Sequence, residues 1–167
     1  IRGVLGSRGL GDVYKRQVLN FKFHNCGAYA ELLSHEMVRS IKDVYRDREF
    51  DLVTCVPMHK DTLRKRGYNQ AELLAKECAR LLGIEYADLL VKTKKNKTQH
   101  SIKAAERAKN VIGVYSPIDK NLIKGKRILI IGDIITTGST LGECARILNK
   151  CKCGEICCCT LCTSLLI

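Results

Sequence analysis

The chain has 167 residues, enough for one domain with a sizeable hydrophobic core. Its 29 Lys and Arg residues outnumber 17 Asp and Glu residues, and the formal charge of +12 favours polyanionic partners such as nucleic acid, phosphorylated metabolites or an acidic membrane surface. No run of 18 or more apolar residues and no signal peptide is visible, which argues against a membrane-spanning or secreted protein and favours a cytoplasmic one.

The first seventeen residues show no convincing periodicity, and the chain begins with Ile1 rather than Met. Within them, the piece GDVYKRQ resembles a translated adaptor sequence of the kind that contaminates the ends of gene models. We therefore expect residues 1–17 to be a non-native or disordered leader, and the domain itself to span residues 18–167.

Hydrophobic periodicity predicts two helices and a strand in the first half of the domain. Apolar residues recur at helical spacing over 28–46 and again over 69–82, and Gly83 closes the second helix. Between the two helices, the apolar segment DLVTCVP at 51–57 has the length and composition of a strand that ends at Pro57.

The second half continues the alternation, with strands expected at 111–115, 127–131 and 156–162 and a helix from about 140 to 150. Alternating strands and helices imply crossover connections, and therefore an α/β fold with a mostly parallel, twisted sheet flanked by helices on both faces. Ligands bind at the carboxyl ends of the strands in such sheets. Two of these ends carry polar sequences here, after Val56 and after Gly132.

Six of the ten cysteines fall within the segment from Cys151 to Cys162. Their spacing does not resemble a disulfide framework, and in a cytoplasmic protein they would be reduced thiols. A metal site in this segment is one interpretation. We favour the other, a buried inner strand at 156–162, because Cys is small and often buried. We therefore predict no metal site made of protein side chains alone.

The stretch ILIIGDIITTGST, residues 128–140, ends a buried strand on Asp133 and then places hydroxyls and a glycine where a helix begins. The amides of a first helical turn, the hydroxyls and the helix dipole form a cradle for a phosphate, and Gly138 lets the backbone turn tightly. Asp133 would repel the phosphate and suits sugar hydroxyls or a hydrated magnesium ion. The pattern predicts a ribose 5-phosphate site with phosphate ligands among Thr136, Thr137, Gly138, Ser139 and Thr140. The alternative is a buried strand followed by a well-capped helix.

The same thirteen residues resemble the phosphoribosyl pyrophosphate (PRPP) signature of type I phosphoribosyltransferases, which has four apolar residues, two acidic residues and a threonine-rich glycine loop. The resemblance implies a type I phosphoribosyltransferase-like fold, PRPP as the ligand, Mg²⁺ bound together with PRPP, and Asp133 as the catalytic carboxylate. Gly132 stands where the first acidic residue is expected. PRPP binding can then rest on Asp133 and the phosphate loop, whereas efficient turnover is in question.

A second segment, CVPMHKDTLRKRGYNQ at 55–70, resembles ComF-type proteins, the competence-associated homologues of phosphoribosyltransferases. NFKFHNCG at 20–27 and TQHSIKAAERAKNV at 98–111 extend the resemblance, which covers the chain from residue 20 onward. ComF-like proteins usually begin with a cysteine-rich zinc ribbon, and only Cys26 precedes residue 55 here. We therefore expect the chain to be truncated at its N-terminus.

The loop at 57–66 follows the first core strand, on the sheet edge where the PRPP loop is expected. Cations there match the charge of a pyrophosphate, and Arg can bind two oxygens at once, so the candidate ligands are Lys60, Arg64, Lys65 and Arg66. Asn69 and Gln70 open the next helix, where their amides either cap it or reach the ligand. The alternative is a solvated basic loop followed by an N-cap.

Seven Lys and Arg residues and one acid fall between residues 92 and 109. In type I enzymes the corresponding region is a flexible hood that closes over PRPP, so the resemblance implies a basic lid at about 92–110. Closure would exclude water from a reactive ribosyl cation. The candidate ligand contacts in the lid are Gln99, Arg107 and Asn110. A plain charged loop is the alternative.

Three functions fit these features. The first is Mg²⁺-dependent transfer of a phosphoribosyl group from PRPP to an unknown acceptor. The second, implied by the ComF resemblance, is a DNA-uptake accessory protein that binds single-stranded DNA alongside the competence machinery; because only 5% of the residues are aromatic, electrostatics would dominate such binding. The third is a PRPP sensor without turnover, which Gly132 favours.

Overall fold

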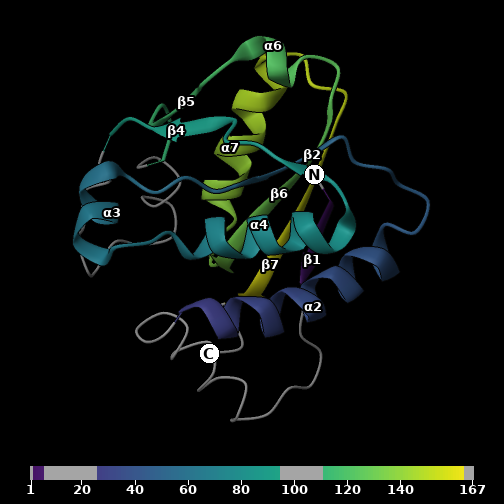
Figure 1. Ribbon diagram of the computed structural model, residues 1–167. Helices are drawn as coiled ribbons and strands as arrows, with labels where there is room; N and C mark the ends of the chain where they lie inside the picture. Colours follow the sequence, from purple (N-terminus) through teal and green to yellow (C-terminus); the bar gives the residue numbers. More distant parts are fainter. Residues whose placement is uncertain (1, 6–25, 95–110, 164–167) are drawn as a thin grey trace.

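The computed structural model describes residues 2–5, 26–94 and 111–163. Its main sheet has five parallel strands in the order β1-β7-β6-β2-β3 (Figure 1). Two further strands form a separate antiparallel pair. The main sheet consists of β1 (Arg2–Leu5), β2 (Leu52–Cys55), β3 (Glu85–Tyr86), β6 (Arg127–Ile135) and β7 (Glu155–Thr163). The antiparallel pair consists of β4 (Leu90–Lys92) and β5 (Tyr115–Pro117).

Helices cover both faces of the main sheet (Figure 1). One face packs against α2 (Cys26–Val44) and α4 (Gln70–Leu82), and the other against α7 (Ser139–Lys150). The β4–β5 pair shares a core with α7. Two short helices, α3 (Lys60–Arg66) and α6 (Lys120–Ile123), lie in the connections. The predicted fold class, a mostly parallel sheet flanked by helices on both faces, is confirmed.

The position of β6 in the centre of the sheet explains why its sequence begins with an unbroken apolar run. Leu129 and Ile131 pack into the core under α2 and α4, whereas Ile128 and Ile130 pack into the core under α7. All four side chains are fully buried. A parallel strand that is covered on both faces needs apolar residues at every position rather than at every second one.

The cysteines of β7 lie in the same interior. Cys157, Cys158 and Cys159 are buried, and the strand lies between β1 and β6. Burial raises the pKa of the Cys158 thiol to about 12, because a thiolate there would lose its hydration. The cysteines whose side chains the structure describes are free thiols. Among the described residues, no group of three His, Cys, Asp or Glu side chains is arranged to hold a metal ion.

The basic segment after β2 is not an open loop as expected, because residues 60–66 form α3. The Nδ1 atom of His59 accepts a hydrogen bond from the Asp61 amide at 3.2 Å and caps the start of the helix. Gly67, with φ of 85°, ends it in the left-handed conformation that favours glycine. The cations of the last turn also suit the negative end of the helix dipole.

The strand expected at 111–115 is displaced. Residues 111–113 form a turn in which Gly113 has φ of 70°, and the strand β5 begins only at Tyr115. Val111 and Val114 are apolar because they are buried in the core under α7, not because they pair in a sheet. Residues 2–5, in the segment that we expected to be a leader, pair with β7 as strand β1.

In the parts of the chain that the structure describes, none of the helices combines the length and the apolar character needed to span a bilayer.

Asp51, directly before β2, is bonded to Arg127 at the start of β6, and this interaction should make the stability of the fold depend on pH. Its carboxylate accepts hydrogen bonds from the Arg127 amide at 2.7 Å and from the guanidinium at 2.9 and 3.2 Å. The bonds from the Arg127 side chain lower the pKa of Asp51 from 3.8 to about 2. A carboxyl with a depressed pKa in the folded state stabilises the fold above the unfolded value, and this contribution is lost as pH falls toward the folded value.

We expect Asp51→Asn to lower the midpoint of urea unfolding at pH 7, and to remove part of the stability loss that the wild type shows between about pH 4 and pH 2. The measurement is a series of urea titrations at stepped pH. Asp119→Asn, at an exposed helix cap, controls for the loss of one negative charge. An acid dependence of Asp51→Asn identical to that of the wild type would contradict the assignment.

Candidate functional site

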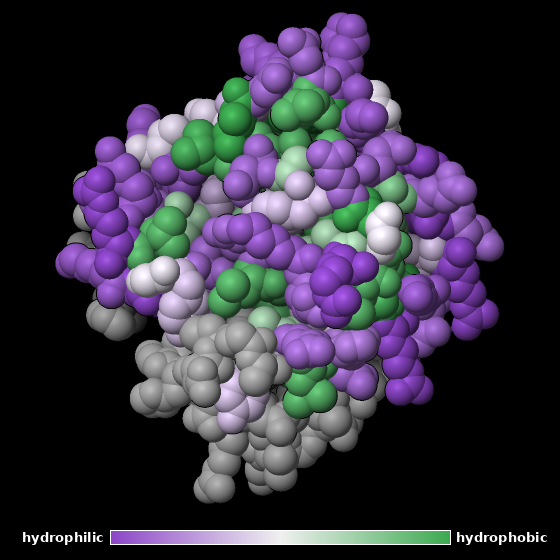
Figure 2. Space-filling view, in the orientation of Figure 1, coloured by the Kyte–Doolittle hydropathy of each residue, from purple (hydrophilic) through white to green (hydrophobic). Residues whose placement is uncertain are grey.

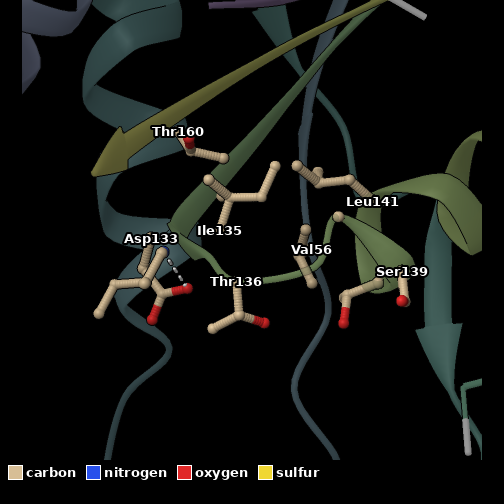
Figure 3. A pocket seen from close by; sticks show the side chains of 11 residues that line it. Val56, Asp133, Ile135, Thr136, Ser139, Leu141 and Thr160 are labelled. Carbon is tan, nitrogen blue, oxygen red and sulfur yellow. Dashed lines mark hydrogen bonds between the residues drawn. The ribbon is translucent and has the colours of Figure 1, made fainter. Parts of the chain in front are cut away.

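A pocket of about 120 Å³ opens where β6 ends and α7 begins (Figure 3). Its walls are formed by residues 132–136 and 138–141, by Val56 directly after β2, and by Thr160 of β7. The three strands β2, β6 and β7 are parallel neighbours, so the segments that follow them meet at one edge of the sheet. The pocket lies at this edge.

One side of the pocket is the turn that starts α7. Gly138 is the N-cap residue, with φ of 75°, and it has no side chain to accept bonds from the first amides of the helix. The Ser139 amide donates only a long bond, of 3.4 Å, to the Thr137 hydroxyl, so the start of the helix can still attract an anion, and the helix dipole adds to this attraction. The side chains of Ser139 and Thr140 line the pocket beside them. The Thr137 hydroxyl bonds to that of Ser139 at 2.7 Å, although Thr137 itself does not line the pocket.

Asp133 stands at the other side of the hollow. Figure 3 shows Asp133, Thr136 and Ser139 in succession along the pocket, with the apolar side chains of Val56 and Leu141 above them in this view. The carboxylate of Asp133 is half-buried, and its Oδ1 accepts a hydrogen bond from the amide of Ile134 at 2.8 Å. This bond fixes the orientation of the carboxylate at the end of the strand.

The donor set suits a sugar phosphate. Hydroxyls and amides at the start of α7 can bind phosphate oxygens, and the Asp133 carboxylate can accept hydrogen bonds from sugar hydroxyls. One carboxylate is also enough for Mg²⁺, which usually takes one or two carboxylates together with substrate phosphates and water. The residues present thus fit a sugar phosphate bound with magnesium.

Residues 69–165, more than half of the chain, match the family model of the phosphoribosyl transferase domain. The chain belongs to this family. Its pocket therefore lies in the phosphoribosyl transferase domain, at the end of the strand whose sequence resembles the PRPP signature.

Two curated relatives extend the similarity beyond the domain. Competence protein F of Haemophilus influenzae is 32% identical over 144 residues, which cover 83% of this chain and 63% of that protein. Competence protein ComFC of Bacillus subtilis is 31% identical over 146 residues, which cover 87% of this chain and 58% of that protein. The resemblance to ComF-type proteins is confirmed. The chain spans about three fifths of the length of these relatives.

A solved structure agrees with the fold. Adenine phosphoribosyltransferase from Saccharomyces cerevisiae superposes with a TM-score of 0.50 at 17% identity, covering 81% of this chain and 67% of that one. At this identity the likeness shows the fold alone, and it confirms the type I phosphoribosyltransferase-like architecture.

The expected pyrophosphate ligands do not line the pocket of this phosphoribosyl transferase domain. Lys60, Arg64, Lys65 and Arg66 are exposed on α3, which buries none of its residues. Figure 2 shows the hydrophilic surface that they form with their neighbours at the α3 side of the molecule. The guanidinium of Arg66 donates a hydrogen bond to Oε1 of Gln70 at 3.0 Å.

Asn69 and Gln70 are both buried. The side-chain oxygen of Asn69 accepts a hydrogen bond from the amide of Ala71 and caps α4, and its Nδ2 donates to the carbonyl of Val56 at 3.2 Å. Gln70 is buried in the first turn of α4. Of the two roles considered for Asn69, capping is the one that the structure contains. Through Val56, the cap also holds one wall of the pocket.

We expect Asn69→Ala to lower the free energy of unfolding by about 1–2 kcal/mol, because the helix loses its cap and the Val56 carbonyl loses a donor. Urea titration measures the change. Asn69→Asp is the matched control, since an aspartate keeps the acceptor for the Ala71 amide but cannot donate to Val56, and it should fall between alanine and the wild type. Equal stabilities for all three proteins would contradict the assigned roles.

The lid candidates Gln99, Arg107 and Asn110 lie outside the described residues. The described start of the expected lid is anchored: the Thr93 amide donates to the carbonyl of Val114 at 2.8 Å, and the Lys92 ammonium lies 5.6 Å from the centre of the Tyr115 ring. Tyr115 of β5 and Leu141 in the first turn of α7 belong to the same buried core.

Thr160 is a polar pocket residue that sequence reasoning missed. In the expected strand at 156–162 it is the one residue that is neither aliphatic nor a cysteine. Its place in the pocket follows from the sheet order, in which Thr160 of β7 is the register partner of Gly132 of β6. A polar residue two positions before the end of a run of core residues was the available signal.

Proposed function

We propose that the chain binds PRPP and, together with Mg²⁺, transfers its phosphoribosyl group to an acceptor in the cytoplasm. The observation that carries this proposal is the pocket after β6, in which Thr136, Ser139 and Thr140 face the same hollow as the first amides of α7. The carboxylate of Asp133 stands at its other side. Family membership supports the same reading.

In this proposal the turn at 136–140 holds the 5-phosphate, and Asp133 accepts hydrogen bonds from the ribose hydroxyls. Mg²⁺ bound with PRPP neutralises pyrophosphate charge, and Asp133 with ligand oxygens would hold it. The exposed cations of α3, the helix that follows β2, are the partners that we propose for the departing pyrophosphate. As the bond between ribose and pyrophosphate breaks, the ribose gains positive charge and the acceptor adds there. The chain contributes positioning and electrostatics rather than a covalent intermediate.

The first test is ligand binding followed by turnover. PRPP with Mg²⁺ should raise the melting temperature, whereas ATP with Mg²⁺ should not, because a ligand that binds only the folded state stabilises it. Pyrophosphate release is then measured with candidate bases and ammonia. Release supports the transferase, and binding without release supports a PRPP sensor, which Gly132 in place of an acidic residue favours. If PRPP does not stabilise the protein, the proposal is wrong.

A second candidate, binding of single-stranded DNA, is favoured by the exposed cations of α3 and by the names of the two competence proteins. The affinity for an oligonucleotide should then fall steeply as salt rises, because phosphate contacts release counterions. Arg64→Gln combined with Lys65→Gln should weaken binding and flatten the salt dependence. Thr137→Ala, in the phosphate turn, should leave DNA binding unchanged. Equal DNA affinity for the wild type and the α3 variant would exclude this surface.

A further inference from the structure

The side chain of Thr160 has a buried hydroxyl without a hydrogen-bond partner among the described residues. The residue is 2% exposed and lines the pocket, and its Oγ1 has no hydrogen-bond partner among the described residues. Leaving a buried hydroxyl unsatisfied costs about 1–3 kcal/mol, and an apolar residue of the same shape would avoid this cost. The fold alone therefore gives no reason for a threonine rather than a valine at this position.

Gly132, the register partner of Thr160, is a glycine because of space rather than backbone conformation. Its φ is not in the left-handed region, in contrast to Gly138. A Cβ atom at position 132 would lie 3.1 Å from Cγ2 of Thr160, and 3.8 Å from the side chains of Val56 and Leu141. All three neighbours line the pocket. The methyl group of Thr160 thus occupies the space into which a side chain at 132 would grow.

We propose that the hydroxyl of Thr160 contacts the sugar ring of the bound ligand, at the place where the PRPP signature has its first carboxylate. This inference rests on the proposed function. In Figure 3 the hydroxyl points away from Asp133, Thr136 and Ser139. Rotation to another staggered χ1 rotamer moves the hydroxyl to the position that the methyl group now occupies, and the methyl group to that of the Cβ hydrogen, so that the hydroxyl then faces Gly132 and the pocket. A hydroxyl both donates and accepts, so it can pair with a sugar hydroxyl without bringing a second negative charge.

The absence of a side chain at Gly132 is a condition for this contact. A Cβ atom there would meet the methyl group of Thr160, and the two together would fill the space between the pocket and the hydroxyl. The two residues therefore work as a pair: glycine on β6 opens the wall, and threonine on β7 supplies the polar group. Asp133 remains the charged group beside the ribose.

The test compares three proteins by calorimetric titration with PRPP and Mg²⁺ and by thermal unfolding. Thr160→Val keeps the shape and removes the hydroxyl, so it should weaken PRPP binding by about tenfold, the loss of one hydrogen bond, while its melting temperature stays equal to or above that of the wild type. Thr160→Ser keeps the hydroxyl and should bind PRPP within about twofold of the wild type. Opposite changes in binding and stability distinguish a ligand contact from a structural role.

A second comparison tests the pairing. Gly132→Ala should weaken PRPP binding, and Gly132→Ala combined with Thr160→Ser should bind more tightly than Gly132→Ala alone, because serine lacks the methyl group that the new Cβ meets. Additive effects would contradict the pairing. If Thr160→Val binds PRPP as tightly as the wild type, or loses stability together with affinity, the inference is wrong although the proposed function stands. If the wild type does not bind PRPP, both are wrong.

Discussion

Replacing Gly138 with valine is expected to abolish PRPP binding while the protein stays folded. The residue has φ of 75°, which a β-branched side chain rarely adopts. Space is not the obstacle, since a Cβ atom there would meet only Cδ1 of Ile135, at 3.7 Å. The turn must change its backbone conformation instead, and the first amides of α7 then no longer converge on the phosphate. Each hydrogen bond to a charged group contributes about 1.5–3 kcal/mol, so the loss of two should weaken binding at least a hundredfold.

The design has two graded controls. Gly138→Asn should bind PRPP with intermediate affinity, because asparagine tolerates the left-handed conformation. Gly142→Ala lies one turn further along α7, where nothing lies within 4 Å of an added Cβ atom. It should leave PRPP binding unchanged and stabilise the helix by about 0.5–1 kcal/mol. Calorimetric titration gives the affinities and circular dichroism the folding. Wild-type affinity in Gly138→Val would show that the phosphate is not bound by this turn.

The second large effect concerns stability. Ile130→Ala should lower the free energy of unfolding by about 2–5 kcal/mol, because the side chain is fully buried in the central strand and its removal leaves a cavity under α7. Pocket residues lie on the same strand, so a loosened β6 should also weaken PRPP binding.

Ile112→Ala is the matched control, since it removes the same atoms from a side chain that is 65% exposed. It should change stability by less than about 0.5 kcal/mol. Urea titrations of the two variants at one pH measure the difference. If Ile130→Ala were no less stable than Ile112→Ala, the placement of Ile130 in the core would be wrong.

The elements with long, regular apolar patterns could be predicted from the sequence. The helices α2, α4 and α7 and the strands β2, β6 and β7 all lie close to their expected positions, because periodicity over many residues reports burial directly. The short elements could not. His59 is not among the usual N-cap residues, so nothing in the sequence marked the start of α3. Val111 and Val114 suggested a strand, because apolar residues that are buried from a turn give the same sequence pattern as apolar residues that are buried in a sheet.

The candidate site, like the fold, could be predicted only in part from the sequence. Asp133 and the turn after it are contiguous in the sequence, so one motif was enough to find them. Thr160 and Val56 are far from that motif in the sequence and reach the pocket only through the order of the strands. Asn69 shows the converse: it follows a basic stretch that suggested a ligand contact, yet its partners are backbone groups of α4 and of the pocket wall.

The buried cysteines of β7 can report on opening of the sheet through their reaction with alkylating reagents. Alkylating reagents attack thiolates, and Cys157, Cys158 and Cys159 are shielded from solvent in the middle of the sheet. Under native conditions they should be modified only when the sheet opens, whereas the partly exposed Cys153 should react before these three. Mass spectrometry of a timed iodoacetamide reaction would thus follow the separation of β7 from its neighbours, without any engineered label.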